Sequence, residues 1–173
     1  MTKICITTPF GAIHAQLALY EAPLTVANFL AYIRVHAYND GHVWRTVVTT
    51  PDNQPNSSVK IDVIQATVVA GFIKFPAIPI ERTKDTGLSH RDGTISMARF
   101  APDSAQADFF ICIGDQPVLD YGGTRNPDGQ GFAAFGQVIK GMDVVREIQR
   151  QPQQEQSLTP AIVITSITVI ADA

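Results

Sequence analysis

The chain has 173 residues, of which 45% are hydrophobic and 17% are charged, and its formal net charge at pH 7 is −3. This composition excludes an intrinsically disordered chain, and the length suffices for one hydrophobic core without a metal ion or a disulfide bond to support it. Nucleic-acid-binding functions are disfavoured as well, because such proteins concentrate lysine and arginine whereas this chain is mildly acidic. We expect residues 1–173 to form a single domain.

Short apolar segments separated by Gly, Pro and Asn predict a mainly β protein. The first two segments, 3–8 and 12–19, are expected to form a hairpin, because apolar and polar side chains alternate along the second. A helix is expected at 23–35, since apolar residues there repeat with helical spacing after Pro23. Further strands are expected at 42–48, 60–70, 93–99, 108–113 and 132–139.

The C-terminal part of the chain is expected to add one helix and one strand. Residues 141–149 carry apolar side chains every three positions and an acidic residue near the start, which is typical of a helix. The last strand, 161–170, changes the parity of its alternation between Ile164 and Ile167, which indicates a bulge or burial on both faces. Many short strands with two helices favour a closed antiparallel barrel that the helices plug or flank.

Three polar segments, 51–58, 121–131 and 149–156, are expected to be exposed loops. Cys5 and Cys112 each lie inside an apolar run, which favours a role as small buried hydrophobic side chains. The first residues lack the apolar run of a signal peptide, and no apolar stretch is long enough to span a membrane. We therefore expect a cytoplasmic protein without membrane contacts.

The sequence lacks the familiar motifs of metal, nucleotide and nucleophilic chemistry. Its four histidines are scattered, without the spacing of metal ligands: His14, His36, His42 and His90. A P-loop and a nucleophile elbow are also missing. The sequence therefore predicts neither a metal site nor a cofactor.

Several sequence blocks, in order and in register, resemble the cyclophilin-type peptidyl-prolyl cis-trans isomerases, in particular the compact bacterial cytoplasmic kind. The most specific blocks are residues 93–99 and 108–112, followed by Leu119 and Asp120. Supporting matches are Pro23, Thr25, Asn28, Phe29, Tyr38, Asn39, residues 135–138 and residues 141–145. The resemblance covers nearly the whole chain. It implies a closed eight-stranded antiparallel barrel capped by two helices, with the active groove on the outside of the barrel.

The resemblance also implies a set of site residues. It places the family's catalytic arginine on Arg45 and its groove glutamine on Gln65. The substrate-binding residues that it implies are Val63, Gln65, Phe110, Leu119 and Phe132, together with backbone groups of Ala98 and Arg99. Within this set, the apolar side chains would hold the pyrrolidine ring of a substrate proline, while Arg45 would stabilise the twisted amide.

This chain departs from the family pattern at several groove positions, which are Trp44, Asp62, Asp108 and Val118. Twenty positions separate Arg45 from Gln65, more than in the family, and the excess includes the 51–58 loop. On this alignment Asp62 replaces a pocket phenylalanine, and its carboxylate would weaken apolar binding or pair with Arg45. Val118 stands where many members have the tryptophan that contacts cyclosporin, so we expect weak cyclosporin binding.

Two functional hypotheses follow from the resemblance. In the first, the protein is an isomerase, or rotamase, that assists protein folding by stabilising the twisted X-Pro amide, and the groove substitutions either reduce its activity or alter its substrate preference. In the second, it is a catalytically weak chaperone or binding module for proline-containing segments. A barrel that holds a small ligand inside ranks third. In the first two cases the partners are proline-containing peptides and unfolded or folding proteins, no cofactor is needed, and we expect a monomer. The position of the Asp62 side chain discriminates between the first two.

Overall fold

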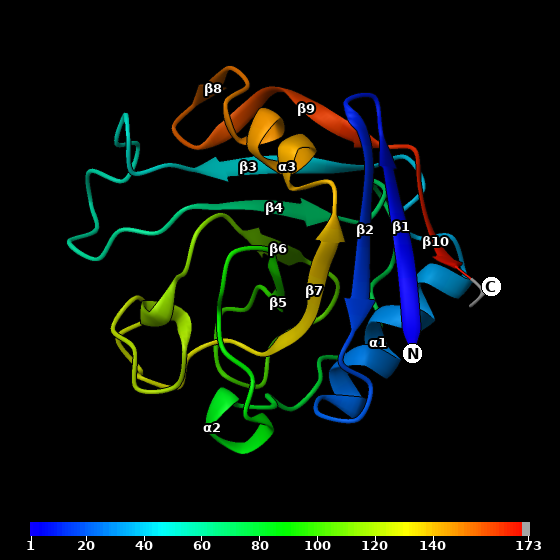
Figure 1. The fold of residues 1–173 in the computed structure, drawn as a ribbon, viewed down its shortest axis with the longest axis horizontal. Helices are drawn as coiled ribbons and strands as arrows, with labels where there is room; N and C mark the ends of the chain where they lie inside the picture. Colours follow the sequence, from blue (N-terminus) through cyan, green and yellow to red (C-terminus); the bar gives the residue numbers. More distant parts are fainter. Residues whose placement is uncertain (171–173) are drawn as a thin grey trace.

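The chain folds into one antiparallel sheet that curls around an apolar core, as the computed structural model of residues 1–170 shows (Figure 1). Ten strands make up the sheet within these residues: β1 (Thr2–Thr8), β2 (Gly11–Leu17), β3 (Gly41–Val47), β4 (Val63–Thr67), β5 (Thr94–Met97), β6 (Phe109–Cys112), β7 (Ala134–Lys140), β8 (Gln153–Gln154), β9 (Ser157–Ile164) and β10 (Ser166–Ile170). Their order across the sheet is β10-β1-β2-β7-β5-β6-β4-β3-β9-β8. The fold is therefore mainly β, as expected.

The expected closed eight-stranded barrel is not confirmed. The sheet has ten strands, and no hydrogen-bonded ladder within residues 1–170 joins β10 at one end to β8 at the other. Instead, the chain itself connects the two sides at Thr165, because β9 pairs with β3 whereas β10 pairs with β1. At this bend the Thr165 N–H donates to the Thr7 carbonyl at 2.8 Å. Ile164 and Ile167 are both buried on either side of it, which explains the change of parity in the sequence.

Three α-helices and a short 3-10 helix accompany the sheet in the described residues, one α-helix more than expected. They are α1 (Pro23–Arg34), α2 (Thr83–Thr86), α3 (Met142–Gln149) and η1 (Pro117–Leu119). Helix α1 begins at a proline, and Glu81 takes the place of an N-cap, since its Oε1 accepts from both Thr25 N–H and Thr25 Oγ1 at 2.6 Å. None of these helices is long and apolar enough to cross a membrane.

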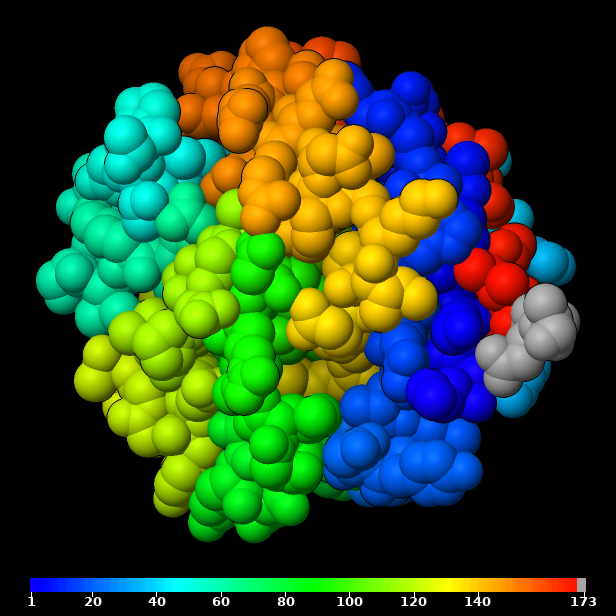
Figure 2. Space-filling model, in the orientation of Figure 1, coloured from blue at the N-terminus to red at the C-terminus, as the bar shows by residue number. Residues whose placement is uncertain are grey.

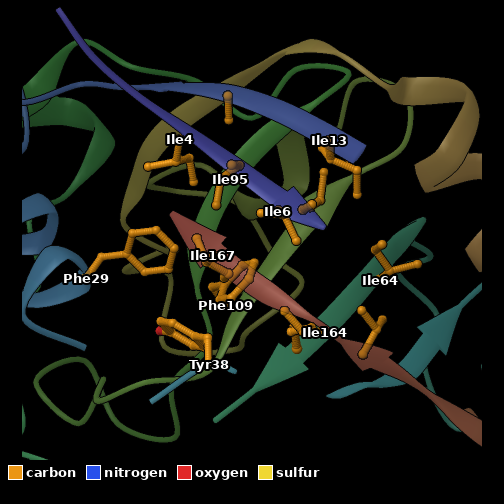
Figure 3. Packing of buried hydrophobic residues seen from close by; sticks show 14 of the residues in the cluster. Ile4, Ile6, Ile13, Phe29, Tyr38, Ile64, Ile95, Phe109, Ile164 and Ile167 are labelled. Carbon is orange, nitrogen blue, oxygen red and sulfur yellow. The ribbon is translucent and has the colours of Figure 1, made fainter. Parts of the chain in front are cut away.

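Apolar side chains fill the inside of the curled sheet (Figure 3). Phe29 of α1 reaches into this core and contacts the rings of Tyr38, Phe109 and Phe135 at centroid distances of 5.1 to 5.2 Å. The remaining hollow inside has a volume of about 10 Å³ and is lined by Ile6, Ile13 and other aliphatic side chains. A space of this size hardly admits one water molecule. The hypothesis that a small ligand binds inside the barrel is therefore wrong.

Candidate binding groove

A second, smaller apolar cluster lies on the outer face of the sheet. Neighbouring residues of a strand point to opposite faces, so Ile64 and Ile111 belong to the core whereas Val63 and Phe110 face outward. We call this set the outer cluster: Val47, Ile61, Val63, Phe110, Cys112 and Leu119, with Ala98, Val118 and Phe132 packed against it. Burial raises the pKa of the Cys112 thiol, which makes it an inert apolar side chain here, as the sequence predicts.

Part of the outer cluster forms the floor of a groove of about 310 Å³, namely Ile61, Val63, Ala98, Phe110, Leu119 and Phe132. Its lining combines apolar and charged side chains: Trp44, Arg45, Ile61, Val63, Gln65, Ala98, Arg99, Phe100, Asp108, Phe110, Leu119, Arg125 and Phe132. The structure thus brings together all eight residues that the sequence predicted for catalysis and substrate binding. Within the groove, the rings of Phe110 and Phe132 meet edge to face with centroids 5.7 Å apart, which defines an apolar slot.

A β-bulge places two consecutive residues of β3 in the groove. The register of β3 with both neighbouring strands shifts between Val43 and Arg45. In regular pleating, Trp44 and Arg45 would point to opposite faces, but a bulge allows both to line the same groove. The altered residue Trp44 is therefore a wall of the groove beside Arg45.

The Arg45 guanidinium is fixed by two amide side chains. Its Nη1 donates to Gln65 Oε1 at 2.9 Å, while Nε and Nη2 donate to Gln156 Oε1 at 2.9 and 2.7 Å. Of its five N–H groups, two remain for a ligand in the groove. Burial lowers the pKa of Arg45, and the charge of Arg125 lowers it further, yet a guanidinium stays protonated at neutral pH.

Gln156 is a site residue that the sequence did not indicate. It belongs to the β8–β9 hairpin, within the segment 149–156 that was expected to be a loop. The turn residues Glu155 and Gln156 have positive φ angles of 50° and 74°, which two-residue hairpin turns require but which Asn and Gly adopt more readily. Without such a turn signal, the pattern could not reveal this hairpin. A non-glycine residue held in this backbone region, with its side chain on Arg45, points to a positioning role.

Asp62 does not point into the groove, contrary to the sequence prediction. Its carboxylate accepts from Thr49 N–H, Thr49 Oγ1 and Gln149 Nε2 at 2.8 to 3.0 Å, and it is not among the residues that line the groove. The apolar neighbour Ile61 lines the groove in its place. The expected loss of apolar binding and the expected Asp62–Arg45 pair are therefore both wrong.

Asp108 lies at one end of the groove and is linked to Arg45 through Gln65. Gln65 Nε2 donates to Asp108 Oδ2 at 3.3 Å, and Thr67 Oγ1 and Lys74 Nζ contact its Oδ1 at 2.5 and 3.4 Å. Gln65 thus accepts from the arginine and donates to the carboxylate, which fixes the orientation of its amide. The groove continues past Asp108 into a hollow of about 150 Å³ that Lys74 and Phe100 also line.

The Ala98 N–H and the Arg99 side chain both bond to other parts of the protein. Ala98 N–H already donates to the Asp108 carbonyl at 3.0 Å, so this amide is not available to a substrate, and the prediction for it is corrected. The Arg99 side chain is 1% exposed and forms a bidentate ion pair with Asp128 at 2.9 Å. The Arg99 guanidinium also donates to the Gly131 carbonyl, and its central carbon lies 4.7 Å from the centroid of the Phe132 ring. These contacts hold that side of the groove in place.

A buried polar network supports the floor of the groove from below. His90 is sealed from solvent, and its ring stacks on Phe110 with a centroid distance of 6.0 Å and an interplanar angle of 13°. Its Nδ1 lies 2.6 Å from Asp120 Oδ1 and its Nε2 lies 2.8 Å from Ser96 Oγ. Burial raises the pKa of Asp120, but the hydrogen bonds and charge of His90 together lower it more, so the carboxylate is ionised and accepts from Nδ1.

This Ser96–His90–Asp120 arrangement resembles the order of groups in serine hydrolases, but it cannot act on a substrate. Ser96 is completely buried, and the Phe110 ring lies between His90 and the groove. A nucleophile must reach the reacting carbonyl, and no path to Ser96 exists here. The network is therefore structural, and the sequence did not reveal it because Asp120 lies 30 positions from His90 and no motif links the three residues.

Two loops meet over one end of the groove. Arg125, from the predicted loop 121–131, donates through Nη1 to Gln54 Oε1, Ser57 Oγ and the Val59 carbonyl at 2.6 to 3.1 Å. Figure 2 shows the two segments side by side, in cyan to turquoise and in yellow-green. Gln54 is buried rather than exposed, since it also bonds both backbone groups of Ile61. The 51–58 segment is therefore a mostly exposed loop, as expected, that Gln54 fastens to Ile61 and Arg125 beside the groove.

A second hollow in the described part of the chain lacks comparable chemistry. A larger hollow of about 520 Å³ lies beside β2 and β7, with Tyr20, Glu21 and Ile139 in its lining, but it contains no arginine. No cluster of three or more His, Cys, Asp or Glu side chains that would suit a metal ion occurs within residues 1–170. The groove that holds Arg45 is thus the candidate site.

Comparison with known proteins connects this groove to a family. The chain matches the family model described as cyclophilin type peptidyl-prolyl cis-trans isomerase/CLD over residues 3–169. It is 35% identical to the peptidyl-prolyl cis-trans isomerase cyp18 of Streptomyces antibioticus, over 86% of this chain and 84% of that protein. It is 33% identical to the peptidyl-prolyl cis-trans isomerase B of Escherichia coli, over 86% and 88%.

A solved structure is similar over the whole chain. The cyclophilin type peptidyl-prolyl cis-trans isomerase of Cryptosporidium parvum superposes with a TM-score of 0.78 at 20% identity, covering 99% of both chains. A crystal structure of that protein in the presence of the dipeptide Ala-Pro gives a TM-score of 0.77 at 20% identity, covering 98% of this chain and 99% of that one. At this level of identity the match establishes the fold.

Proposed function

This chain belongs to the cyclophilin-type peptidyl-prolyl cis-trans isomerase family, and we propose that it catalyses the rotation of X-Pro peptide bonds in the groove that holds Arg45. The observation that carries this proposal is the position of the Arg45 guanidinium beside the apolar slot of Phe110 and Phe132, with two N–H groups free of protein partners in the described structure. The activity of the curated relatives, as their names give it, supports the same reaction.

The chemistry of the reaction explains why one fixed cation suffices. Rotation about a peptide bond has a barrier of about 18–20 kcal/mol because amide resonance is lost, and uncatalysed X-Pro isomerisation takes tens to hundreds of seconds. No bond is made or cleaved. In the twisted state the prolyl nitrogen becomes pyramidal and gains a lone pair, which can accept a hydrogen bond that the planar amide cannot. A donor at this nitrogen therefore stabilises the transition state more than either planar form.

In this mechanism the protein holds the substrate proline and the Arg45 guanidinium in fixed positions. The pyrrolidine ring of the proline would lie in the slot above Phe110 and Leu119, while Arg45 faces the amide from β3. Because Gln65 and Gln156 hold three of its N–H groups, the guanidinium needs little reorganisation when the amide twists. Asp62 points away from the slot, which removes the main reason to expect a groove that only binds.

The experiment that tests this proposal measures cis-to-trans isomerisation of short X-Pro peptides together with their dissociation constants. We expect a rate that rises in proportion to protein concentration for at least part of the panel. A well-folded protein that binds the peptides but leaves every one at its uncatalysed rate would favour the alternative, a binding module for proline-containing segments. A crystal structure of a structural neighbour in the presence of Ala-Pro supports such peptides as ligands in either case.

Gln156→Ala is expected to lower kcat/KM about tenfold, equivalent to about 1.4 kcal/mol, mainly through kcat. The variant removes the acceptor of Arg45 Nε and Nη2, so the guanidinium samples positions away from the twisted amide. Glu155→Gln is the matched control, since it changes the neighbouring exposed residue of the same turn and should leave both constants unchanged. A loss confined to KM would contradict a positioning role and indicate direct substrate binding instead.

Weak cyclosporin binding is a further proposal, based on Val118. This side chain packs against the outer cluster but is not among the residues that line the groove in the described structure. Val118→Trp is expected to strengthen cyclosporin binding about tenfold, which corresponds to about 1.4 kcal/mol, by adding an aromatic face at the groove. Calorimetric titration would check this, with Val118→Leu as the control. Equal affinity of the tryptophan variant and the natural protein would refute the role of this position.

The remaining sequence expectations stay predictions. These are a cytoplasmic location, a monomeric state, and unfolded or folding proteins as the partners of the groove. The groove opens on the outer face of the sheet, beside the segments 51–58 and 121–131, and it is accessible to an extended polypeptide rather than enclosed. This accessibility supports protein segments as substrates.

A further inference from the structure

Two arginines of the groove have no acidic partner. Arg45 from β3 and Arg125 from the loop 121–131 both line it, and neither forms an ion pair with a carboxylate within residues 1–170. Arg99 provides the contrast, because its charge is balanced by a bidentate pair with Asp128. Two guanidinium groups that share a groove and pair with no carboxylate directly repel each other, and an anionic ligand beside Arg125 would relieve that repulsion.

Neutral oxygen atoms hold both guanidinium groups in place. Arg125 Nη1 donates to Gln54 Oε1, Ser57 Oγ and the Val59 carbonyl, so Nε and Nη2 keep their N–H groups free of protein partners in the described structure. Arg45 is held by two amides in the same way. These contacts fix the position of each charge without cancelling it. The charge of Arg125 contributes to the lowered pKa of Arg45, after burial, which indicates that the two groups interact.

The groove is electrostatically asymmetric. Asp108 lies where the groove continues into the adjoining hollow, whose lining shares Gln65, Ala98 and Arg99 with the groove. Asp108 contacts Thr67 at the end of β4, whereas Ile61 precedes the start of β4 and Arg125 bonds the Val59 carbonyl, so Ile61 and Arg125 lie at the other end of the groove. An extended peptide along the groove would therefore meet a carboxylate at one end and an unpaired guanidinium at the other.

We propose that the Arg125 end of the groove is a subsite for an acidic side chain, so that this protein selects proline-containing segments with a Glu or Asp within two residues of the proline on one side. The inference rests on the proposed function and specifies its substrate class. Arg125 would pair with the carboxylate through Nε and Nη2, the forked geometry that suits carboxylates. The charge of Arg45 would add attraction, while its remaining N–H groups stay on the prolyl amide. At the other end, Asp108 would disfavour an acidic residue.

A set of peptides with acetylated and amidated ends tests the proposal. The reference peptide carries Gln at two positions before and two positions after the X-Pro bond, and each variant replaces one Gln by Glu. We expect Glu on one side of the proline to lower the dissociation constant and to raise kcat/KM about five- to tenfold relative to Gln, and Glu on the other side to weaken binding. Raising the salt concentration to about 0.5 M should reduce the difference.

Protein variants assign the effect to a residue. Arg125→Gln should bring the Glu-to-Gln ratio of dissociation constants close to one, whereas Arg34→Gln, which removes an exposed charge at the end of α1, should retain the natural ratio. Because Arg125 also anchors the 51–58 segment, Arg125→Lys serves as a second variant. It keeps the charge without the forked geometry, so it should retain a reduced but measurable preference for Glu.

The outcomes separate this inference from the proposed function. Dissociation constants that agree within about twofold at every Glu position overturn the acidic subsite, whatever the turnover. Selective binding of the Glu peptides without any catalysed isomerisation overturns the isomerase function and leaves the subsite standing. The same peptides are also measured with a free C-terminal carboxylate, and a gain that appears only in that form overturns the assignment to a side chain.

Discussion

Replacing Arg45 by alanine is expected to lower kcat/KM for X-Pro isomerisation about a hundredfold to a thousandfold, the usual cost of removing one donor that stabilises a transition state. In the proposed mechanism the guanidinium supplies the hydrogen bond to the twisted amide, and Gln65 and Gln156 hold three of its N–H groups without competing for the other two. Peptide affinity should change much less, because the apolar slot of Phe110 and Phe132 remains. Steady-state kinetics and peptide titration of the same preparation would check both parts.

Arg45→Lys is the matched variant for this experiment. Lysine retains the charge but presents a flexible point donor instead of a rigid fork, so it cannot keep both Gln156 and Gln65 as partners and still face the amide. We expect it to recover little of the lost rate. Full activity of the lysine variant would mean that charge alone is sufficient, and full activity of the alanine variant would remove Arg45 from the mechanism.

His90→Leu is expected to reduce the free energy of unfolding by roughly 3 kcal/mol. Leucine has a similar size but cannot bond Ser96 Oγ or Asp120 Oδ1, and Ser96 is buried where no water replaces the lost partner. An unsatisfied buried polar group costs about 1–3 kcal/mol, and the lost bond to a carboxylate adds to this. Urea denaturation of the natural protein and the variant would measure the difference.

The double variant His90→Leu/Ser96→Ala provides the control for that interpretation. It removes the orphaned hydroxyl together with its partner, so it should recover about 1 kcal/mol relative to His90→Leu alone. Because the His90 ring also stacks on Phe110, both variants should bind proline peptides more weakly. A loss of stability below about 1 kcal/mol in His90→Leu would contradict a supporting role for the network.

The sequence was sufficient to predict most elements of the fold. The hairpin of β1 and β2, helices α1 and α3 and the central strands lie within a few residues of their predicted ranges, because each has a clear period and a turn signal at its ends. The connection between the two sides of the sheet was not predictable in this way. It depends on the bend at Thr165, on either side of which Ile164 and Ile167 both face the core, and the sequence marks that bend only by a change of parity.

In the candidate site, too, the sequence predicted residues that a local pattern places, but not those whose orientation depends on distant contacts. The apolar floor and Arg45 were predicted through the family blocks, since strand alternation fixes which residues face outward. Asp62 was misplaced because the alignment across the 51–58 segment cannot decide which of two neighbouring residues faces the groove. Hydrogen bonds to Thr49 and Gln149 turn Asp62 away and leave Ile61 inside.

Gln156 and His90 could not be identified from the sequence for a physical reason. Gln156 reaches Arg45 across 111 positions of the chain, and it does so from a turn whose residues carry no glycine or asparagine. His90 looks like any isolated histidine until the fold brings Asp120 and Ser96 to its two nitrogen atoms. Such contacts depend on tertiary structure and leave no periodic pattern.

One measurement tests the central claim most directly: the exchange between the cis and trans forms of a single X-Pro peptide, followed by NMR at equal peptide occupancy with the natural protein and with Arg45→Ala. The account predicts rapid exchange on the natural protein and exchange close to the uncatalysed rate on the variant, with similar affinity for the peptide. Uncatalysed exchange on the fully occupied natural protein would contradict the account and leave the groove as a binding site only.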